Sequence, residues 1–254
     1  MSEHRYFLHL AFDGSAFHGW QRQPNAATVQ QTLEEALSML LRTSICLTGA
    51  GRTDAGVHAE DFYAHFDIDH EMTAVEREKL VFKLNSYLAG DIAIAGIIPV
   101  APGVHARFTA TFRTYRYCIA RRKNPFRQNY THFIHGPLDY DLMNQGAALI
   151  MSYSDFTSFS KVDSDTRTNI CKITQAWWQP VDGELVFTIT ADRFLRNMVR
   201  AIVGTLLQLG TGKITLEALK GIIESHNRSD AGDSVPARGL SLHRVGYPEG
   251  TFCE

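Results

Sequence analysis

The sequence has few cysteines, and none of them is paired with another in a way that indicates a disulfide or a metal site. Its four cysteines lie far apart, and no CxxC pair occurs; they are Cys46, Cys118, Cys171 and Cys253. Disulfide frameworks and zinc knuckles both depend on closely grouped cysteines. We therefore expect four reduced thiols.

Long apolar runs and a secretory start are also missing. Hydrophobic residues make up 44% of the 254 residues, yet no run is long enough to span a bilayer. Residues 1–5 lack the basic start and apolar core of a signal peptide. These features predict a cytoplasmic globular protein without a membrane partner, long enough for one large domain or two modest ones.

Acidic residues are absent between Asp91 and Asp139, although the chain as a whole has a net charge of −2. This interval carries +7, so the rest of the chain carries −9; the basic residues are Arg107, Arg113, Arg116, Arg121, Arg122, Lys123 and Arg127. A local basic surface attracts phosphates even on an acidic protein. The alternative is a strand with a solvated basic face, and charge alone favours a polyanionic partner only slightly.

The first hundred residues predict the order β-α-β-β-α-β, which is the ferredoxin-like split motif. Residues 28–42 place apolar side chains at helical spacing and begin with Thr28 and Gln31, a capping box. The expected strands are residues 5–12, 45–50, 62–68 and 91–98, and a second helix is expected at 73–88. Residues 99–104 contain two prolines and a glycine, which is typical of a boundary. We therefore predict domains at 1–104 and 105–254.

The second half resembles the first in the order of its elements. The expected strands are residues 111–121, 169–178, 184–192 and 241–247, and the expected helices are 140–151, 195–209 and 216–225. The helix at 195–209 is apolar nearly all round, which is typical of a buried helix. The prediction is an α+β fold whose antiparallel or mixed sheets are covered on one face by helices.

The most informative string is residues 51–59, Gly-Arg-Thr-Asp-Ala-Gly-Val-His-Ala. It predicts a tight loop with glycines on both sides and the carboxylate of Asp54 at its apex. Arg52 lies two residues away, and a nearby arginine keeps an aspartate ionised and nucleophilic. The simpler interpretation is an ordinary turn with a capping aspartate.

Six further strings accompany this loop. They are residues 12–21 (FDGSAFHGWQ), 28–37 (TVQQTLEEAL), 82–85 with 91–92 (FKLN, DI), 105–108 with 113–117 (HARF, RTYRY), 155–159 (DFTSF) and 194–204 (FLRNMVRAIVG). Together with the loop, they resemble the tRNA pseudouridine synthase A family over nearly the whole chain and in the same order. Each string is weak alone, but seven in register are not expected by chance.

The resemblance implies a pseudouridine synthase fold made of two ferredoxin-like halves with an active-site cleft between them. It implies an enzyme that isomerises uridines 38, 39 and 40 in the anticodon arm of tRNA, without a cofactor or a metal. The target base must be flipped out of the RNA. The glycosidic bond then breaks, the uracil rotates, and C5 reattaches to the sugar. The resemblance also implies a homodimer.

The resemblance further assigns roles to individual residues. It makes Asp54 the catalytic carboxylate, but whether Asp54 attacks the sugar or the base, or promotes a glycal route, stays open. Tyr115 should stack on the target base, whereas Tyr117 is better suited to the core. Arg200, which lies among apolar residues, should pair with Asp54. Arg52 should contact the flipped nucleotide or fill the space that it vacates, and the simpler alternative is that Arg52 binds a phosphate. The candidates for contact with the RNA backbone are Arg107, Arg113, Arg116, Arg121 and Arg122.

One string departs from the family pattern, and two other functions remain open. Residues 239–242 read Gly-Leu-Ser-Leu where the family often has Gly-Leu-Tyr-Leu, so Ser241 replaces an aromatic ring. His58 and Glu60 match half of the zinc deaminase signature, but no P-C-x-x-C follows. The β-α-β-β-α-β order also suits a non-catalytic RNA-binding module, although the aromatic residues around Tyr115 do not follow the RRM pattern.

Overall fold

The computed structural model describes residues 4–161 and 167–253. The chain divides into two compact units, Met1–Thr111 with Leu242–Glu254, and Phe112–Ser241. The described residues form a mixed fold of five α-helices and nine strands; the sequence predicts all five helices and every strand except the short one at His132–Phe133. None of these helices is long and apolar enough to cross a membrane.

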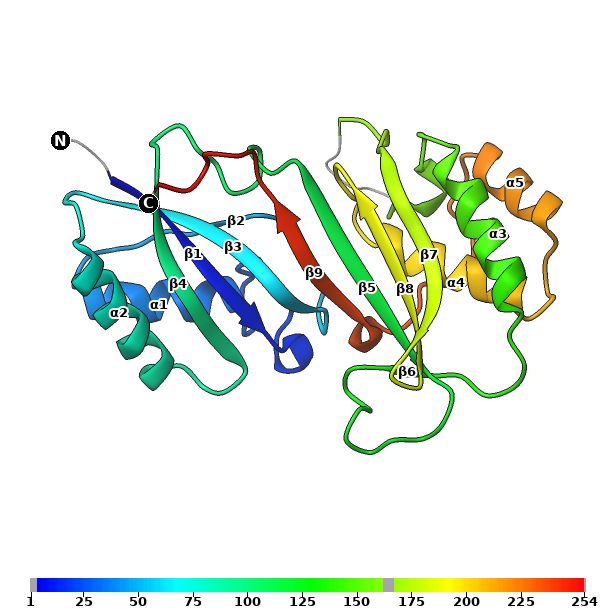
Figure 1. The fold of residues 1–254 in the computed structure, drawn as a ribbon, viewed down its shortest axis with the longest axis horizontal. Helices are drawn as coiled ribbons and strands as arrows, with labels where there is room; N and C mark the ends of the chain where they lie inside the picture. The colour runs from blue at the N-terminus through cyan, green and yellow to red at the C-terminus, as the bar shows by residue number, and fades with distance from the viewer. Residues whose placement is uncertain (1–3, 162–166, 254) are drawn as a thin grey trace. The chain divides into compact units, whose positions relative to one another are not determined.

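The first unit contains the ferredoxin-like motif (Figure 1). Its strands follow the order β4-β1-β3, with β2 on the far side of β3, and all these pairs are antiparallel. The last part of the closing strand β9 follows β3 in the same order. The elements are β1 (His4–Phe12), α1 (Val29–Leu41), β2 (Thr48–Gly49), β3 (His58–Ile68), α2 (Ala74–Tyr87), β4 (Ile92–Val100) and β9 (Leu240–Gly246).

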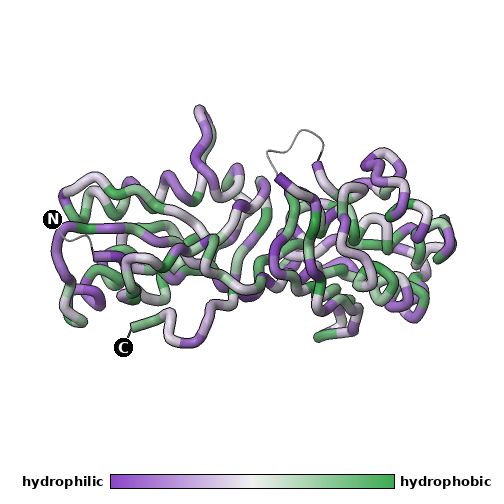
Figure 2. The backbone as a smooth tube through the Cα atoms, turned by 90° about the horizontal axis from the view of Figure 1, so that it is seen from above, coloured by the Kyte–Doolittle hydropathy of each residue, from purple (hydrophilic) through white to green (hydrophobic). Residues whose placement is uncertain are grey.

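Strand alternation places one face of this sheet in the core. Tyr6, Leu8 and Leu10 of β1 are at most 1% exposed, and they share that face with Phe62 and Phe66 of β3. Figure 2, in which the backbone is coloured by hydropathy, shows apolar and polar residues interspersed along the chain. The intervening residues of each strand point to the opposite face. The opposite face is also covered, because Phe7 is 0% exposed and packs with Val100 and Ala106, so burial along β1 does not follow a strict period of two.

The second unit repeats the order of the first (Figure 1). β5 pairs with β8, and β8 with β7, in antiparallel register, just as β1 pairs with β3 and β3 with β2. The β7–β8 hairpin turns at Asp182 and Gly183, which both have positive φ, as a two-residue turn requires. The elements are β5 (Phe112–Ala120), β6 (His132–Phe133), α3 (Tyr140–Met151), β7 (Ile173–Val181), β8 (Glu184–Ala191), α4 (Met198–Gly210) and α5 (Leu216–Glu224).

Several predicted limits are wrong. β3 begins at His58 rather than residue 62, because the polar Glu60 and Asp61 hide the alternation at its start. Only Thr48–Gly49 of the expected strand at 45–50 is paired. β4 runs on through Val100, and its Pro99 is tolerated on an edge strand.

Two further limits differ in the second unit. α4 begins at Met198 rather than residue 195, because Asn197 has a φ of 67° and adopts the left-handed conformation, which ends a right-handed helix. β7 begins at Ile173 rather than residue 169, since Ile170 bridges to Asp155 instead of joining the sheet.

The predicted capping box of α1 is only half correct. The Thr28 hydroxyl accepts a hydrogen bond from Gln31 N at 3.4 Å, so the helix begins where the sequence predicts. The Gln31 side-chain amide, however, donates to Glu35 at 2.8 Å. A complete capping box is present in α2, where Thr73 and Glu76 satisfy each other's backbone N–H groups.

Candidate functional site

Asp54 lies in the loop between β2 and β3 of the first unit, and its side chain is half-buried. Val57 N donates to Asp54 O at 3.2 Å, which closes a turn with Ala55 and Gly56 at its centre. Gly56 has a φ of 77°, a conformation that residues with a side chain rarely adopt. This part of the string therefore forms a tight turn, as the sequence predicts, but Asp54 stands at the start of the turn rather than at its apex.

A second loop, which follows β1, braces the Asp54 turn. Gly56 N donates to Phe17 O at 3.2 Å, and Trp20 N donates to Thr53 O at 3.3 Å. A Cβ atom on Gly19 would lie 2.4 Å from Thr53 O, so the two backbones touch directly. These contacts fix the backbone on both sides of Asp54.

Gly14 makes a second direct contact between these two loops. A Cβ atom at Gly14 would lie 2.0 Å from Val57 O, far inside any real contact distance. Gly14 N also donates to Nδ1 of the buried His58 at 3.1 Å, and Asp13 Oδ1 lies 3.0 Å from the same nitrogen. His58 thus anchors the loop after β1, a use that the sequence does not reveal.

His58 and Glu60, which match half of the zinc deaminase signature, do not lie together as metal ligands would. His58 faces Gly14 and Asp13, whereas Glu60 lies 2.8 Å from His243 Nδ1. In the described ranges, no three His, Cys, Asp or Glu side chains are grouped as metal ligands. Both residues of the H-x-E pattern serve contacts within the first unit.

Two predicted RNA-binding arginines also belong to the first unit. Arg52 is exposed on the Asp54 loop. The Arg107 guanidinium lies 5.6 Å from the ring centroid of Phe108, and that ring is 76% exposed. His105 Nδ1 accepts hydrogen bonds from the backbone N–H groups of Arg107 and Phe108, at 3.1 and 3.2 Å, and so shapes this turn.

The two tyrosines of β5 have different environments in the second unit. Tyr115 is half-buried, and its ring packs edge-on against Phe194 with centroids 5.1 Å apart. Tyr117 is fully buried and donates its hydroxyl hydrogen to Pro236 O at 3.0 Å. Burial raises the pKa of Tyr117 well above its usual value. The prediction that Tyr117 belongs to the core is confirmed, and Phe194 is a neighbour of Tyr115 that sequence reasoning did not single out.

Arg200 lies in the first turn of α4, among buried apolar residues such as Met198 and Ile202. Its Nε donates to Val235 O at 2.7 Å, and Val235 N donates to Arg200 O at 3.3 Å. The chain around Val235 therefore holds the guanidinium in one orientation. A half-buried charge held in this way is set up for a fixed anionic partner.

The remaining arginines of the basic segment have different environments. Arg113 donates to Asp192 O at 2.9 Å, and Arg121 donates to Ile134 O at 2.8 Å. Arg127 forms two hydrogen bonds to the Glu184 carboxylate, at 2.9 and 3.0 Å. In the described part of the chain, the buried Nε of Arg116 has no hydrogen-bond partner. Hydrogen bonds within the protein therefore already engage Arg113, Arg121 and Arg127, which carry part of the positive charge between Asp91 and Asp139.

Ser241, the residue that departs from the family pattern, is half-buried at the start of β9. Gly239, two residues earlier, lies against the ring of Tyr117, because a Cβ atom there would be 2.7 Å from Tyr117 Cζ. The string 239–242 thus adjoins the buried tyrosine of β5 rather than standing alone.

These features define the class of the protein. A half-buried aspartate stands on a rigidly braced loop in one ferredoxin-like unit, and a half-buried tyrosine and arginine stand in a second unit of the same order. The family model described as tRNA pseudouridine synthase matches residues 153–248.

The full chain gives the family more closely. It is 50% identical over 253 residues to tRNA pseudouridine synthase A of Bacteroides thetaiotaomicron, covering 98% of this chain and 93% of that protein. It is 51% identical over 253 residues to that of Bacteroides fragilis, covering 99% and 100%. The Clostridium acetobutylicum protein is 38% identical over 242 residues, covering 94% and 98%. The chain belongs to the tRNA pseudouridine synthase A family and is therefore an enzyme.

Proposed function

We propose that this enzyme converts uridine to pseudouridine at positions 38, 39 and 40 in the anticodon arm of tRNA. Family membership supports the reaction, and the family's tRNA target supports the positions. The observation that carries the proposal is the placement of Asp54, whose loop is held by hydrogen bonds and by two glycines in contact with it. A catalytic group must be held in this way, because small displacements cost large factors in rate.

Asp54 begins the reaction on a uridine that has been flipped out of the RNA stack. The bond between C1′ and N1 breaks, the uracil turns in place, and C5 bonds to C1′. The C5 hydrogen leaves as a proton and N1 takes up a proton, so the product is an isomer of uridine. No atom other than hydrogen enters or leaves, so the reaction needs no oxidant or co-substrate. Three roles for the Asp54 carboxylate are consistent with these bond changes: it attacks the sugar, it attacks the base, or it promotes a glycal route.

The second unit supplies the other proposed roles. Tyr115, half-buried and edge-on to Phe194, offers a ring face on which the target base stacks. Arg200 pairs with the Asp54 carboxylate and holds it in place, which suits a guanidinium already oriented by Val235 O. Arg52, Arg107, Arg113 and Arg116 contact the nucleotide or its phosphates.

The organisation of the enzyme is part of the same proposal. We infer an active-site cleft between the two halves, which the sequence predicts at 1–104 and 105–254 and which the structure divides at 1–111 with 242–254, and 112–241. We also infer a homodimer and a cytoplasmic location. The charge distribution supports tRNA as the partner, since the interval between Asp91 and Asp139 carries +7.

Tritium release tests the reaction and the role of Asp54 together. With tRNA labelled at uracil C5, we expect release by the wild-type enzyme and none above background by Asp54→Ala or Asp54→Asn, while both variants still bind tRNA. Asp69→Asn is the matched control, because Asp69 is an exposed aspartate of the same unit whose side chain is 77% accessible. It should release tritium at the wild-type rate.

The other outcomes have equally clear meanings. Wild-type protein that binds tRNA but releases no tritium would favour the RNA-binding module over the enzyme. Release by Asp54→Asn at the wild-type rate would remove Asp54 from the chemistry.

A further inference from the structure

The loop between β5 and β6, residues 121–131, carries an exposed ring and unopposed positive charge. Phe126 is 89% exposed, the highest exposed fraction among the large hydrophobic residues of the described chain. Arg122 and Lys123, four and three residues earlier, are also exposed. Single exposed apolar residues are common on protein surfaces. An exposed aromatic ring beside exposed cations is the combination that binds single-stranded nucleic acid.

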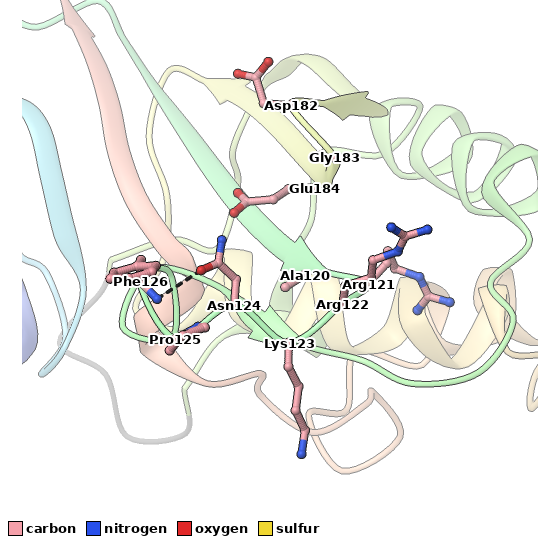
Figure 3. Close-up of a pocket in the computed structure, with 10 residues that line it drawn as sticks. All are labelled: Ala120, Arg121, Arg122, Lys123, Asn124, Pro125, Phe126, Asp182, Gly183 and Glu184. Atoms are coloured by element: carbon pink, nitrogen blue, oxygen red, sulfur yellow. Dashed lines mark hydrogen bonds between the residues drawn. The ribbon is translucent and has the colours of Figure 1, made fainter.

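The loop is held in shape by contacts at several points. Phe126 N donates to Asn124 Oδ1 at 3.0 Å, as Figure 3 shows, and Arg127 N donates to Asn124 O at 3.1 Å. Arg127 is attached to β8 through its two hydrogen bonds to Glu184. The Thr131 hydroxyl donates to Arg127 O at 2.9 Å. The backbone that carries Phe126 is therefore held in shape, which lowers the ordering entropy that binding a ligand at this loop costs.

The loop borders a pocket of about 300 Å³ that also meets the β7–β8 turn (Figure 3). Its two carboxylates do not cancel the exposed positive charge. Glu184 is neutralised by Arg127, and Figure 3 places Asp182 on the opposite side of the pocket from Lys123. Lys123 extends away from the pocket wall, where it is accessible to a phosphate. The lining thus presents the ring of Phe126 at one end and the side chain of Arg122 at the other, with Lys123 between them (Figure 3).

We propose that this loop is a second RNA-binding element, in which an unpaired base of the tRNA substrate stacks on Phe126 while Arg122 and Lys123 contact the adjoining phosphates. The proposal rests on the proposed function, because it takes tRNA as the substrate. Every base has an aromatic face, so the element adds affinity without reading sequence. That property suits an enzyme that must hold different tRNAs while the reaction proceeds elsewhere.

Substitution of Phe126 tests the stacking contact. Phe126→Ala should raise the Kd for tRNA by about 5-fold to 100-fold, the range that loss of one stacked base gives, with kcat within about twofold of wild type. Phe126→Leu should lose a similar amount, because it keeps the apolar volume but lacks a ring, and Phe126→Trp should restore binding. Lys123→Ala should weaken binding and reduce the slope of log K against log salt by about one.

Phe82→Ala is the matched control, since Phe82 is 74% exposed on α2 of the other unit. It should bind tRNA like wild type. An unchanged Kd for Phe126→Ala would overturn the proposal. A change in the oligomeric state of Phe126→Ala, measured by light scattering, would also overturn it, because it would assign the loop to a subunit interface. Tritium release by the wild type is measured in parallel: its absence would refute the proposed function, whereas release with unchanged binding by Phe126→Ala would refute only this inference.

Discussion

Replacing Gly14 with alanine tests whether contact between two loops sets the position of Asp54. The new Cβ atom would lie 2.0 Å from Val57 O and 2.6 Å from Val57 C, whereas real Cβ contacts are essentially never shorter than 3.0 Å. The loop after β1 and the Asp54 turn must therefore separate by about 1 Å. Both atoms that block the methyl group belong to the backbone, so no side-chain rotation can relieve the contact.

Two magnitudes follow from this displacement. Overpacking of this kind costs about 1–3 kcal/mol of unfolding free energy, and for a chain of this size each kcal/mol lowers Tm by roughly 2–4 °C. A shift of about 1 Å at a catalytic group reduces kcat by about 100-fold. We therefore expect Gly14→Ala to fold with a lower Tm and to lose far more activity than its lost stability explains.

Calorimetry and tritium release at a temperature well below Tm measure the two effects separately. Gly51→Ala is the control, because it adds the same methyl group three residues before Asp54 at a position with no atom within 4 Å. Its Tm should match that of the wild type. If Gly14→Ala kept both the wild-type Tm and the wild-type kcat/KM, the contact between the loops would not position Asp54.

Two further predictions concern pH and salt. Burial and the charge of Arg5 lower the pKa of His65 to about 4, and its neutral Nδ1 accepts a hydrogen bond from Ala106 N at 3.1 Å. The folded state thus binds fewer protons than the unfolded state between pH 4 and the ordinary value of 6.5, so the free energy of unfolding falls as pH drops through this window. Urea unfolding of His65→Gln should show a weaker fall, and equal falls in both proteins would contradict this. Separately, tRNA affinity measured by filter binding should drop at least about tenfold between roughly 50 and 200 mM salt, and an affinity independent of salt would exclude phosphate contacts by the basic segment.

The sequence by itself determined the type and order of the elements. Period-two alternation in β1 and helical spacing in α1 are local patterns, and each is completed within one element. The same holds for Tyr117, whose place in the core follows from its position on β5. Family membership was also readable, because seven separate strings keep their order along the chain.

Where the local pattern was broken, the predicted limits of the strands and helices are wrong. The polar Glu60 and Asp61 lie within β3, and their side chains interrupt the apolar alternation that would have placed its start at His58. Asn197 ends the helical conformation through its backbone angle rather than its side-chain polarity. Neither effect follows from hydrophobic periodicity.

Only the tertiary structure decided which residues support the site. Gly14 touches Val57 across 43 positions of sequence, and Arg127 binds Glu184 across 57. Gly51, by contrast, has open space around it, although it belongs to the same signature string as Asp54. The physical reason is that periodicity records which face of an element is buried, whereas a contact between distant residues depends on strand register and on the approach of two backbones.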